Sequence, residues 1–468
     1  MRRMPIALRL IPAVLAGSAV LVLAAAPAGA VSNASDWSAY LHGPNHNSFA
    51  AGQKAITPTT TVTSKWHFAD SFLTSPVVAD GAVFAGSFLG NLYKFNAATG
   101  AVENKIFMGL VKSAHCGELG FATNVTVAND PSRHEDVVYV AAPDGFLHAF
   151  SEATMTELWK SRIIPTPGNA YFQWSSPTVA NGKIYVGISS NCDIPLVRGG
   201  VAGFKQSSGA RFGTFYNVPK GKIGGSVWST PAVDSAGNVY ISTGNATTRV
   251  NTALTDSIVK LSPALKKLGS WTIPLGPDIG GDDDFGASPT VFSARINAKT
   301  TPMVGACNKN GVYYALNAKT MKLVWKARIG ATASEATQAS CLAAAAYNGK
   351  HLFMGGLGAT IGGKQFAGNV VELNPNNGKV VWRSGLPDAV IGSPALNGAG
   401  VLAVGTFALG HATCTSCASY LLNASNGRVL QKLTSGTGTD AGQIAFAEGR
   451  VFVPISFGTA QGVYAFGP

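Results

Sequence analysis

Apolar and polar positions alternate along this chain in short runs rather than in long helical periods. Val77 lies in the first of many β-branched or aromatic runs, which Asp80-Gly81 and later Thr99-Gly100 interrupt. Asp-Gly and Asn-Gly pairs favour tight hairpin turns, because those turns need residues that tolerate a positive φ. No segment after the N-terminal 30 residues has a long 3.6-residue apolar period. The pattern therefore predicts many short strands and few helices.

The strands belong to one unit that recurs along almost the whole chain. The clearest copy, at residues 176–187, reads Ser-Pro-Thr-Val-Ala-Asn-Gly-Lys-Ile-Tyr-Val-Gly. Further copies open on Ser-Pro or Thr-Pro, and degenerate copies lack that pair; they start at or near Ser75, Asn124, Thr230, Ser288, Cys341, Ser393 and Gln443. A unit of this size cannot bury its own apolar face and must stack on its neighbours. Four short antiparallel strands per copy predict a propeller blade.

Eight copies predict an all-β, eight-bladed β-propeller. The last copy ends at Pro468 and lacks a fourth strand after its Tyr-Ala-Phe. The segment 62–68, which contains Trp66, has the character of a fourth strand without a copy of its own. We expect this N-terminal strand to complete the last blade and close the ring, since full closure removes exposed sheet edges.

The N-terminus has the pattern of an export signal. Arg2, Arg3 and Arg9 precede an almost wholly apolar stretch at 11–26, and Ala-Gly-Ala at 28–30 fits a cleavage site. We expect residues 1–30 to be a signal peptide and residues 31–468 to form one secreted or extracytoplasmic propeller domain. No later apolar stretch is long enough to span a bilayer, so we expect no transmembrane anchor after cleavage.

The charge of the chain argues against a nucleic-acid partner. The formal net charge is +12, but only 12% of residues are charged, against roughly 25% in average soluble proteins. The Lys and Arg residues are scattered, without the basic stripe that nucleic-acid binding needs. The charge fits solubility, or adhesion to acidic cell-surface polymers.

Six cysteines behind an export signal favour three disulfides. Cys116 and Cys192 lie in corresponding loops of neighbouring copies, and we predict that they are bonded. Cys307 and Cys341 stand in a similar relation, one copy apart. The spacing alone leaves the pairing open.

The remaining two cysteines lie close together in sequence. Cys414 and Cys417 are expected to close a small loop on themselves. His411 makes a His-x-x-Cys-x-x-Cys pattern, which would suit zinc if a fourth ligand were present. The missing ligand and the oxidising compartment favour the disulfide.

Four polar features fall where blade loops would converge on a central channel. Three successive carboxylates, including Asp282 and Asp284, could bind a cation or act as a general base, or could form an exposed acidic loop. Asn245 could ligate Ca²⁺ or serve as a turn residue. Lys309 could hold an oxyanion or a quinone oxygen, or lie on the surface. Asp193 and Arg198 share a loop, and could simply pair with each other.

Signatures of other enzyme classes are absent from the sequence. There is no Gly-x-Ser-x-Gly nucleophile elbow, no His-Glu-x-x-His zinc motif and no phosphate-binding Gly-x-x-x-x-Gly-Lys-Ser/Thr loop.

The repeat resembles that of the pyrroloquinoline-quinone (PQQ) repeat, or quinoprotein alcohol dehydrogenase-like, β-propellers. Residues 36–40 (Asp-Trp-Ser-Ala-Tyr) and 43–47 (Gly-Pro-Asn-His-Asn) are similar to the opening motif of that family. The segments 227–231, 243–245 and 282–289 resemble the polyvinyl-alcohol-dehydrogenase-like branch. The segment 309–316 is similar to the lysine strand of quinoprotein alcohol dehydrogenases. The resemblance covers nearly the whole chain after the signal.

The resemblance implies roles for the polar residues. Asn245 would be a Ca²⁺ ligand, and Asp284 or Asp282 would supply a further ligand and the general base. Lys309 would face the reactive quinone oxygen, and Arg198 would contribute to cofactor binding. Asp193 stands one or two residues from the position of the acidic calcium ligand of the family. The chain departs from the family in lacking adjacent cysteines, a Pro-Trp after Gly-Asn, and a tryptophan before Asp282.

Two functions are consistent with these residues. The first is a PQQ- and Ca²⁺-dependent dehydrogenase of alcohols or polyols. The second is a cofactor-free propeller scaffold that binds a protein or a cell-wall partner, because the fold alone does not specify activity. An enzyme needs convergent Asn, Asp and Lys side chains and an aromatic floor, whereas a scaffold does not.

Overall fold

The structure is a computed structural model, which describes residues 36–468 except 115, 166–169, 247–252, 275–283, 332–339, 409–415 and 434–441. The expected signal peptide at 1–30, Asp282, His411 and Cys414 lie outside the described residues. Within the described ranges, no helix is long and apolar enough to cross a membrane.

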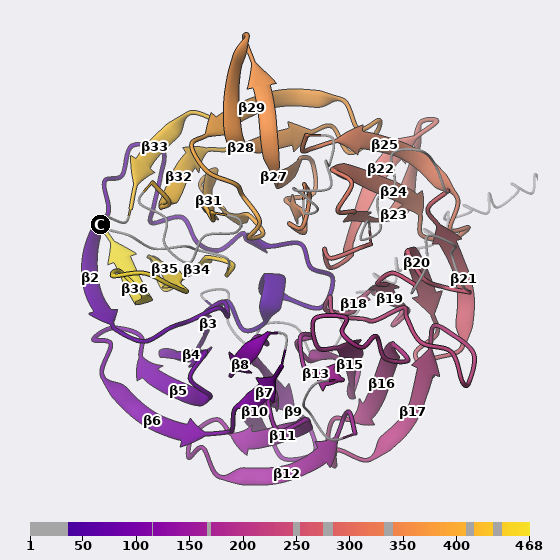
Figure 1. Cartoon of the computed structure of the whole chain (residues 1–468). Coiled ribbons are helices and arrows are strands. Elements are labelled where there is room, and N and C mark those ends of the chain that lie inside the picture. Colours follow the sequence, from indigo (N-terminus) through magenta and orange to yellow (C-terminus); the bar gives the residue numbers. More distant parts are fainter. Residues whose placement is uncertain are drawn as a thin grey trace, which may run out of the picture.

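Eight antiparallel sheets stand around a central axis and confirm the predicted eight-bladed propeller (Figure 1). Blades 1 to 4 are built from the following strands: β3 (Val77–Ala79), β4 (Ala82–Gly86), β5 (Asn91–Asn96) and β6 (Val102–Phe107); β9 (Thr126–Asp130), β10 (Glu135–Ala141), β11 (Phe146–Ser151) and β12 (Glu157–Arg162); β14 (Thr178–Ala180), β15 (Lys183–Ser190), β16 (Gly200–Lys205) and β17 (Arg211–Tyr216); β18 (Ala232–Val233), β19 (Val239–Ser242), β20 (Ser257–Leu261) and β21 (Lys267–Thr272).

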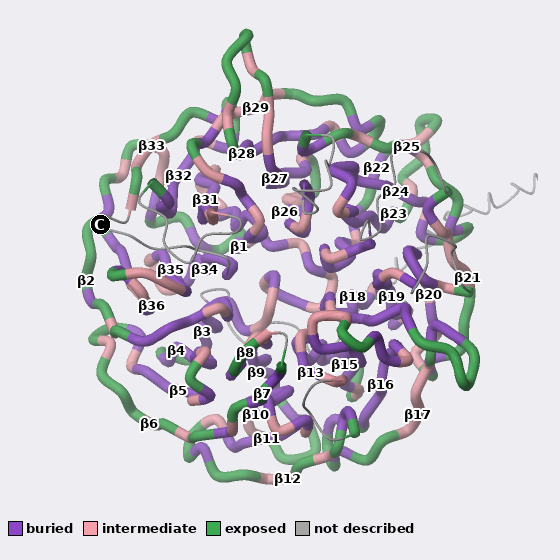
Figure 2. The backbone as a smooth tube through the Cα atoms, in the orientation of Figure 1, coloured by how far each residue is buried: buried purple, intermediate pink, exposed green. Residues whose placement is uncertain are grey.

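Blades 5 to 8 complete the ring. Their strands are β22 (Thr290–Ile296), β23 (Lys299–Cys307), β24 (Val312–Asn317) and β25 (Leu323–Arg328); β26 (Ala346–Tyr347), β27 (Leu352–Ile361), β28 (Lys364–Leu373) and β29 (Val380–Leu386); β30 (Ala395–Asn397), β31 (Val401–Gly405), β32 (Ser419–Asn423) and β33 (Val429–Lys432); β34 (Ala445–Ala447), β35 (Arg450–Ile455) and β36 (Gly462–Gly467). The inner strands are buried and the outer strands are the exposed ones (Figure 2).

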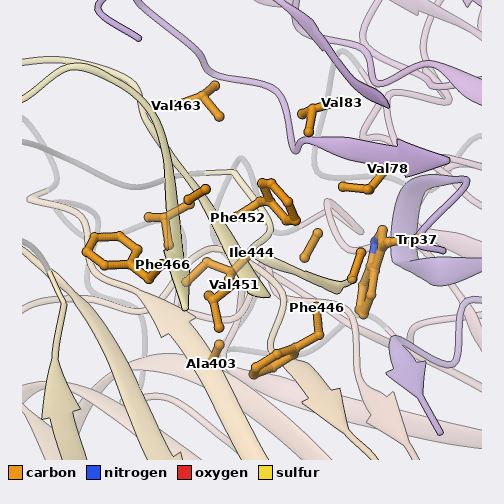
Figure 3. Close-up of a cluster of buried hydrophobic side chains, with 14 of the residues drawn as sticks. Trp37, Val78, Val83, Ala403, Ile444, Phe446, Val451, Phe452, Val463 and Phe466 are labelled. Carbon is orange, nitrogen blue, oxygen red and sulfur yellow. The ribbon is translucent and has the colours of Figure 1, made fainter. Parts of the chain in front are cut away.

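The N-terminal strand closes the ring, as predicted. β2 (Thr63–Phe68) pairs antiparallel with β36 and becomes the outer strand of blade 8, with Trp66 opposite Ala465 and His67 opposite Tyr464. The side chains of blade 8 and blade 1 then share one apolar core, in which Phe452 and Val83 lie near each other (Figure 3). Two segments from opposite ends of the chain thus form one blade.

A tryptophan on the outer strand of one blade packs on a glycine of the next blade. The ring of Trp66 lies against Gly100, where a Cβ atom would come within 2.6 Å of the indole, and its Nε1 donates to Ala97 O at 3.0 Å. Trp325 on Gly378 and Trp382 on Gly427 repeat this packing. This contact explains why the repeat pairs a Thr-Gly or Asn-Gly turn with a tryptophan.

The Ser-Pro positions form a hydrogen-bonded ring around the axis. The backbone N–H at this position of one blade donates to the side chain at the same position of the next: Ser75 to Asn124 (2.8 Å), Asn124 to Ser176 (2.9 Å), Ser176 to Thr230 (3.1 Å), Thr230 to Ser288 (2.9 Å), Ala344 to Ser393 (2.9 Å) and Gln443 to Ser75 (2.7 Å). Buried backbone N–H groups need such partners. The recurring hydroxyl and amide side chains therefore join the blades.

The N-terminal segment plugs one end of the channel, which the sequence did not predict. The turn η1 (Tyr40–His42) lies at the centre of the ring, and β1 (Phe49–Ala50) pairs in parallel with β30 (Figure 1). Carbonyls of the plug accept hydrogen bonds from the inner strands: Ser38 from Val127, Pro44 from Val233, Asn45 from Val291, Asn47 from Tyr347 and Ser48 from Leu396. The plug contacts residues that follow the Ser-Pro ring, so the opposite end of the channel is left for a site.

The predicted Cys116–Cys192 disulfide is present, and Cys307 and Cys341, whose pairing the sequence left open, are bonded as well. Cys116–Cys192 has a Cα–Cα distance of 6.4 Å, and Cys307–Cys341 has one of 5.4 Å. Cys116 lies on an extra hairpin between blades 1 and 2, formed by β7 (Val111–Ser113) and β8 (Gly117–Leu119), whereas Cys192 follows β15 of blade 3. The expectation that the two lie in corresponding loops of neighbouring copies was therefore wrong, because the hairpin is an insertion between blades. Blade 3 also carries an added strand, β13 (Tyr171–Phe172). Cys417 is disulfide-bonded as well, and its expected partner Cys414 lies outside the described residues.

Candidate functional site

Blade 5 brings a carboxylate side chain and an ammonium side chain together at the end of the channel away from the plug. Asp284 lies four residues before Ser288, on the segment that enters β22, and Lys309 lies in the hairpin between β23 and β24. Gly311 closes this hairpin with a φ of 85°, a conformation that favours glycine. The Lys309 N–H donates to Asp284 O at 3.0 Å, which fixes the two segments side by side.

The side chains of these two residues form a buried ion pair. Lys309 Nζ lies 2.8 Å from Asp284 Oδ1, and the two side chains are only 12% and 1% exposed. Burial of two charges is unfavourable unless they are closely paired and hydrogen-bonded. The arrangement is therefore one that the surrounding structure has to hold in place.

Trp228 completes the cluster, although the sequence analysis gave it no role. Its Nε1 donates to Asp284 Oδ2 at 3.0 Å, and Lys309 Nζ lies 5.0 Å from the centre of its ring. The Asp284 carboxylate thus has one oxygen toward an ammonium and the other toward an indole N–H. The only available signal was the position of Trp228 just ahead of the Thr-Pro of blade 4, within a motif already recognised as family-like.

Asn245 comes directly after Gly244, which lies against the side chain of Asp284. A Cβ atom on Gly244 would lie 3.1 Å from Asp284 Oδ2, so only the bare backbone fits there easily. Asn245 Oδ1 is buried, and it has no hydrogen-bond partner in the part of the chain that the structure describes. A buried amide oxygen without a donor is costly unless a ligand supplies the partner.

Asp193 approaches the same cluster from blade 3. Burial raises the pKa of the Asp193 carboxyl, and the charge of Asp284 raises it further, while a hydrogen bond from Ser190 and the charge of Lys309 lower it. The Ser190 hydroxyl bonds both Asp193 Oδ1 and, at 2.9 Å, Ser226 Oγ. Ser226 in turn lies against Gly244, where a Cβ atom would come within 3.3 Å of Ser226 Cβ, so contacts lead from Asp193 to the backbone beside Asp284.

Arg198 has contacts of its own, away from this pair. Its guanidinium stacks on the ring of Tyr216 at 4.0 Å, and its Nε donates to Val218 O at 3.0 Å. It forms no ion pair with Asp193, so the simple alternative of an Asp193–Arg198 pair is not what the structure shows. Asp282, the other proposed base, lies outside the described residues.

The residues present fit a hard cation. In the described ranges, no group of three or more His, Cys, Asp and Glu side chains is placed to bind a metal. The cluster instead offers the carboxylates of Asp193 and Asp284 and the unsatisfied amide oxygen of Asn245. A set made only of oxygen atoms suits Ca²⁺ and similar ions rather than zinc.

A cavity of about 210 Å³ lies on the axis beside this cluster. Trp228 and Trp174 line it together with residues of the Ser-Pro ring, and Tyr40 of the plug also borders it. The Tyr40 hydroxyl hydrogen-bonds Ser393 and Ser288, and burial raises its pKa. The cavity is thus lined by aromatic side chains and by hydroxyl groups of the Ser-Pro ring.

Comparison with known families and sequences identifies similar proteins. Residues 111–262 and 308–430, together more than half of the chain, match the family model described as outer membrane protein assembly factor BamB. Polyvinylalcohol dehydrogenases of Pseudomonas sp and Sphingopyxis sp. (strain 113P3) are each 25% identical, over 54% and 50% of this chain. The matches span only 44% and 41% of those relatives.

Solved structures share the fold at lower identity. The quinohemoprotein alcohol dehydrogenase of Comamonas testosteroni has a TM-score of 0.73 at 16% identity, covering 92% of this chain and 80% of that one. A europium-containing methanol dehydrogenase has a TM-score of 0.72 at 14% identity, covering 93% and 99%. BamB from Moraxella catarrhalis has a TM-score of 0.54 at 14% identity, covering 87% and 100%.

Proposed function

Since this chain belongs to the PQQ-repeat β-propeller family whose model is described as outer membrane protein assembly factor BamB, we propose that it is a PQQ- and Ca²⁺-dependent dehydrogenase of alcohols or polyols. The observation that carries the proposal is the buried Asp284–Lys309 pair against Trp228, with Gly244 packed on Asp284 and the unsatisfied amide oxygen on the next residue, Asn245. A propeller scaffold has no need of a buried ion pair and an orphaned amide oxygen at the mouth of its channel.

In this proposal the oxygen atoms hold the cation and the aromatic ring holds the cofactor. Asn245, Asp284 and Asp193 would be the protein ligands of Ca²⁺. Trp228 would present its ring face to the flat cofactor, and Lys309 would reach a quinone oxygen with the ammonium that now contacts Asp284. Arg198 would contribute from the rim of the site. When bound, PQQ would supply the two-electron oxidant and Ca²⁺ a Lewis acid.

In this proposal Asp284 would take the proton of the alcohol. Its carboxylate is held by the Trp228 N–H on one oxygen and by the Lys309 ammonium on the other. A general base has to be fixed within hydrogen-bond reach of the proton that it removes. Because both contacts come from rigid elements of blades 4 and 5, Asp284 would meet the substrate without rearrangement of the backbone. Asp282 is a second candidate for this role.

Export to an oxidising compartment is part of the proposal. The two inter-blade disulfides support it, because such bonds persist outside the cytosol. The polyvinylalcohol dehydrogenases matched by half of this chain support an alcohol substrate.

The test is dye reduction by the protein reconstituted with PQQ and Ca²⁺, with small secondary alcohols and polyvinyl alcohol as substrates. We expect turnover in the wild type and its loss in Asp284→Asn, which removes the base with little change in volume. The matched control is Asp234→Asn, because Asp234 also accepts hydrogen bonds but lies at the opposite end of β19 from Asn245. Equal turnover in wild type and Asp284→Asn would contradict the proposal.

The alternative function is a cofactor-free scaffold for a protein or cell-wall partner. The match to the BamB family model and to the BamB structure favours it. Under this alternative the purified protein binds neither PQQ nor Ca²⁺, and the Asp284–Lys309 pair is only structural.

A further inference from the structure

The loop that carries Asp193 has an unusual backbone. Cys192 and Asp193 are consecutive non-glycine residues with φ values of 55° and 58°. This left-handed region is unfavourable for most residues with a Cβ atom, although Asp tolerates it, so the conformation of Cys192 is the one that its surroundings have to support. Such conformations concentrate at sites where a side chain has to be held in one direction.

One of the attachments that hold this loop is covalent. Cys192 is bonded to Cys116, on the hairpin of β7 and β8. This hairpin forms a two-stranded sheet of its own and packs in a small apolar cluster with Phe172 and Trp174, separate from the cores between blades. The bridge therefore ties the Asp193 loop to a separate hairpin that comes from between blades 1 and 2.

The other attachments are hydrogen bonds at and beside Ser190. Ser190 N–H donates to Ser226 Oγ at 3.1 Å, and Ser190 O accepts a hydrogen bond from the Trp174 indole N–H at 3.1 Å. These contacts fix the start of the loop, two residues before Cys192. The Ser190 hydroxyl also donates to Asp193 Oδ1, and Asn191 N–H donates to Ala170 O at 3.1 Å. The covalent bond at Cys192 adds an attachment on the residue next to Asp193.

We propose that the Cys116–Cys192 disulfide is the positioning device for Asp193, and that it keeps the Asp193 carboxylate directed at the cation site with Asp284 and Asn245. The inference rests on the proposed function, since it needs a cation to be bound there. It assigns to the bridge an effect on cation affinity in addition to its effect on stability. Asp193 is the ligand, and Cys116 and Cys192 are positioning residues.

The second disulfide provides an internal control. Cys307 and Cys341 are fully buried, whereas Cys116 and Cys192 are half-buried. Dithiothreitol at low concentration should therefore open the Cys116–Cys192 bridge first, giving two thiols and oxidised dithiothreitol. Alkylation followed by peptide mapping identifies which bridge has been opened in protein that is still folded.

The experiment is a Tb³⁺ titration of the full-length mature protein, with emission excited through Trp228. Only the Tb³⁺ emission that is lost in Asp284→Asn is counted. Emission that remains in this variant comes from Tb³⁺ bound at acidic sites elsewhere and is subtracted. We expect Cys116→Ser/Cys192→Ser to bind Tb³⁺ about tenfold or more weakly than wild type, as is typical when a group that orients a ligand is lost. The luminescence lifetime should also shorten, because water replaces the carboxylate. Cys307→Ala/Cys341→Ala should lower the melting temperature and leave the affinity near that of wild type.

A second comparison separates positioning from general loosening of the fold. In an Asp193→Asn background, removal of the Cys116–Cys192 bridge should weaken Tb³⁺ binding no further. Unchanged affinity in the bridge variant, or equal weakening with and without Asp193, overturns the inference while leaving the proposed function standing. Absence of any Asp284-dependent binding in wild type overturns both. If Cys116→Ser/Cys192→Ser fails to fold, the Tb³⁺ affinity of wild type whose Cys116–Cys192 bridge has been opened by dithiothreitol tests the same expectation.

Discussion

The corresponding hairpins of blades 1 and 5 have the same backbone and different chemistry. In blade 1, Phe88 N–H donates to Ser71 O at 2.7 Å; in blade 5, Lys309 N–H donates to Asp284 O at 3.0 Å. Each acceptor lies four residues before the serine of its Ser-Pro pair. The turns close on glycines with φ values of 81° and 85°. One framework therefore holds an uncharged pair, a serine and a phenylalanine, in one blade and a buried ion pair in the other.

The difference shows where function lies in a repeat protein. Phe88 packs against Phe457, with ring centres 5.5 Å apart, and so belongs to the apolar packing of its region. Lys309 at the equivalent position faces a carboxylate and an indole ring. Residues that recur in every blade build the ring, and residues that depart from the repeat build the site.

The largest effect is expected when the site of blade 5 is replaced by the residues of blade 1. Asp284→Ser/Lys309→Phe removes both charges together, so no buried charge is left unpaired. We expect turnover in the reconstituted dye assay to fall by about 10³-fold or more, since the base is lost. The melting temperature, measured by circular dichroism, should change little. Ser71→Ala/Phe88→Leu in blade 1 is the matched control and should retain turnover.

The next effect concerns a residue of the repeated framework. Trp66→Ala removes the indole that packs on Gly100 and joins the closing strand to blade 1. We expect a loss of about 3–5 kcal/mol in the free energy of unfolding, measured by urea denaturation, with PQQ affinity unchanged. Trp66→Phe keeps most of the packing, loses only the bond to Ala97 O, and should cost about 1 kcal/mol. A smaller loss for Trp66→Ala than for Trp66→Phe would contradict this account.

A third effect distinguishes the plug from the site by pH. Burial lowers the pKa of His46 from 6.5 to about 4, and its Nδ1 lies 3.0 Å from Pro289 O. Because the unfolded state binds the proton first, stability is full above pH 6.5 and falls as the pH drops toward 4. One histidine with this pKa shift lowers the free energy of unfolding by about 2 kcal/mol at pH 5. Melting temperatures from pH 8 to 4.5 should show a smaller decline in His46→Gln, and an unaltered decline in a control at the exposed His67.

The smallest effect is expected in the hydrogen-bonded ring. Ser176→Ala leaves the backbone N–H of Asn124 without its acceptor. We expect a cost of about 1–2 kcal/mol, the usual penalty for one buried unsatisfied donor. Urea denaturation should detect this loss, while cation affinity stays the same. A loss of cation affinity here would mean that the ring and the site are not separable.

The fold was predictable because its information is repeated. Ser-Pro or Thr-Pro pairs, turn glycines and closing tryptophans recur in most of the blades, and the missing strand of the last blade pointed to Trp66 and its segment. The plug was not predictable, because its pairing with β30 spans only two residues of each strand and joins positions about 350 residues apart. No local pattern records such a contact.

The site was predictable only in part, for the opposite reason. Asp284 and Lys309 stood out because charges interrupt an apolar repeat. Trp228 was hidden by its resemblance to the framework tryptophans, and Ser190 by being an ordinary serine in a chain rich in them. The expectation for Arg198 came from its place in a motif, whereas its stacking on Tyr216 depends on a strand fold that the motif does not encode.

The central claim is that departures from the repeat in blade 5 create a PQQ site, and an absorbance titration with PQQ tests it most directly. We expect wild type to bind one PQQ per chain only when Ca²⁺ is present, and Asp284→Ser/Lys309→Phe to bind none while remaining folded. Failure of wild type to bind PQQ, or equal binding by the two proteins, would contradict the account.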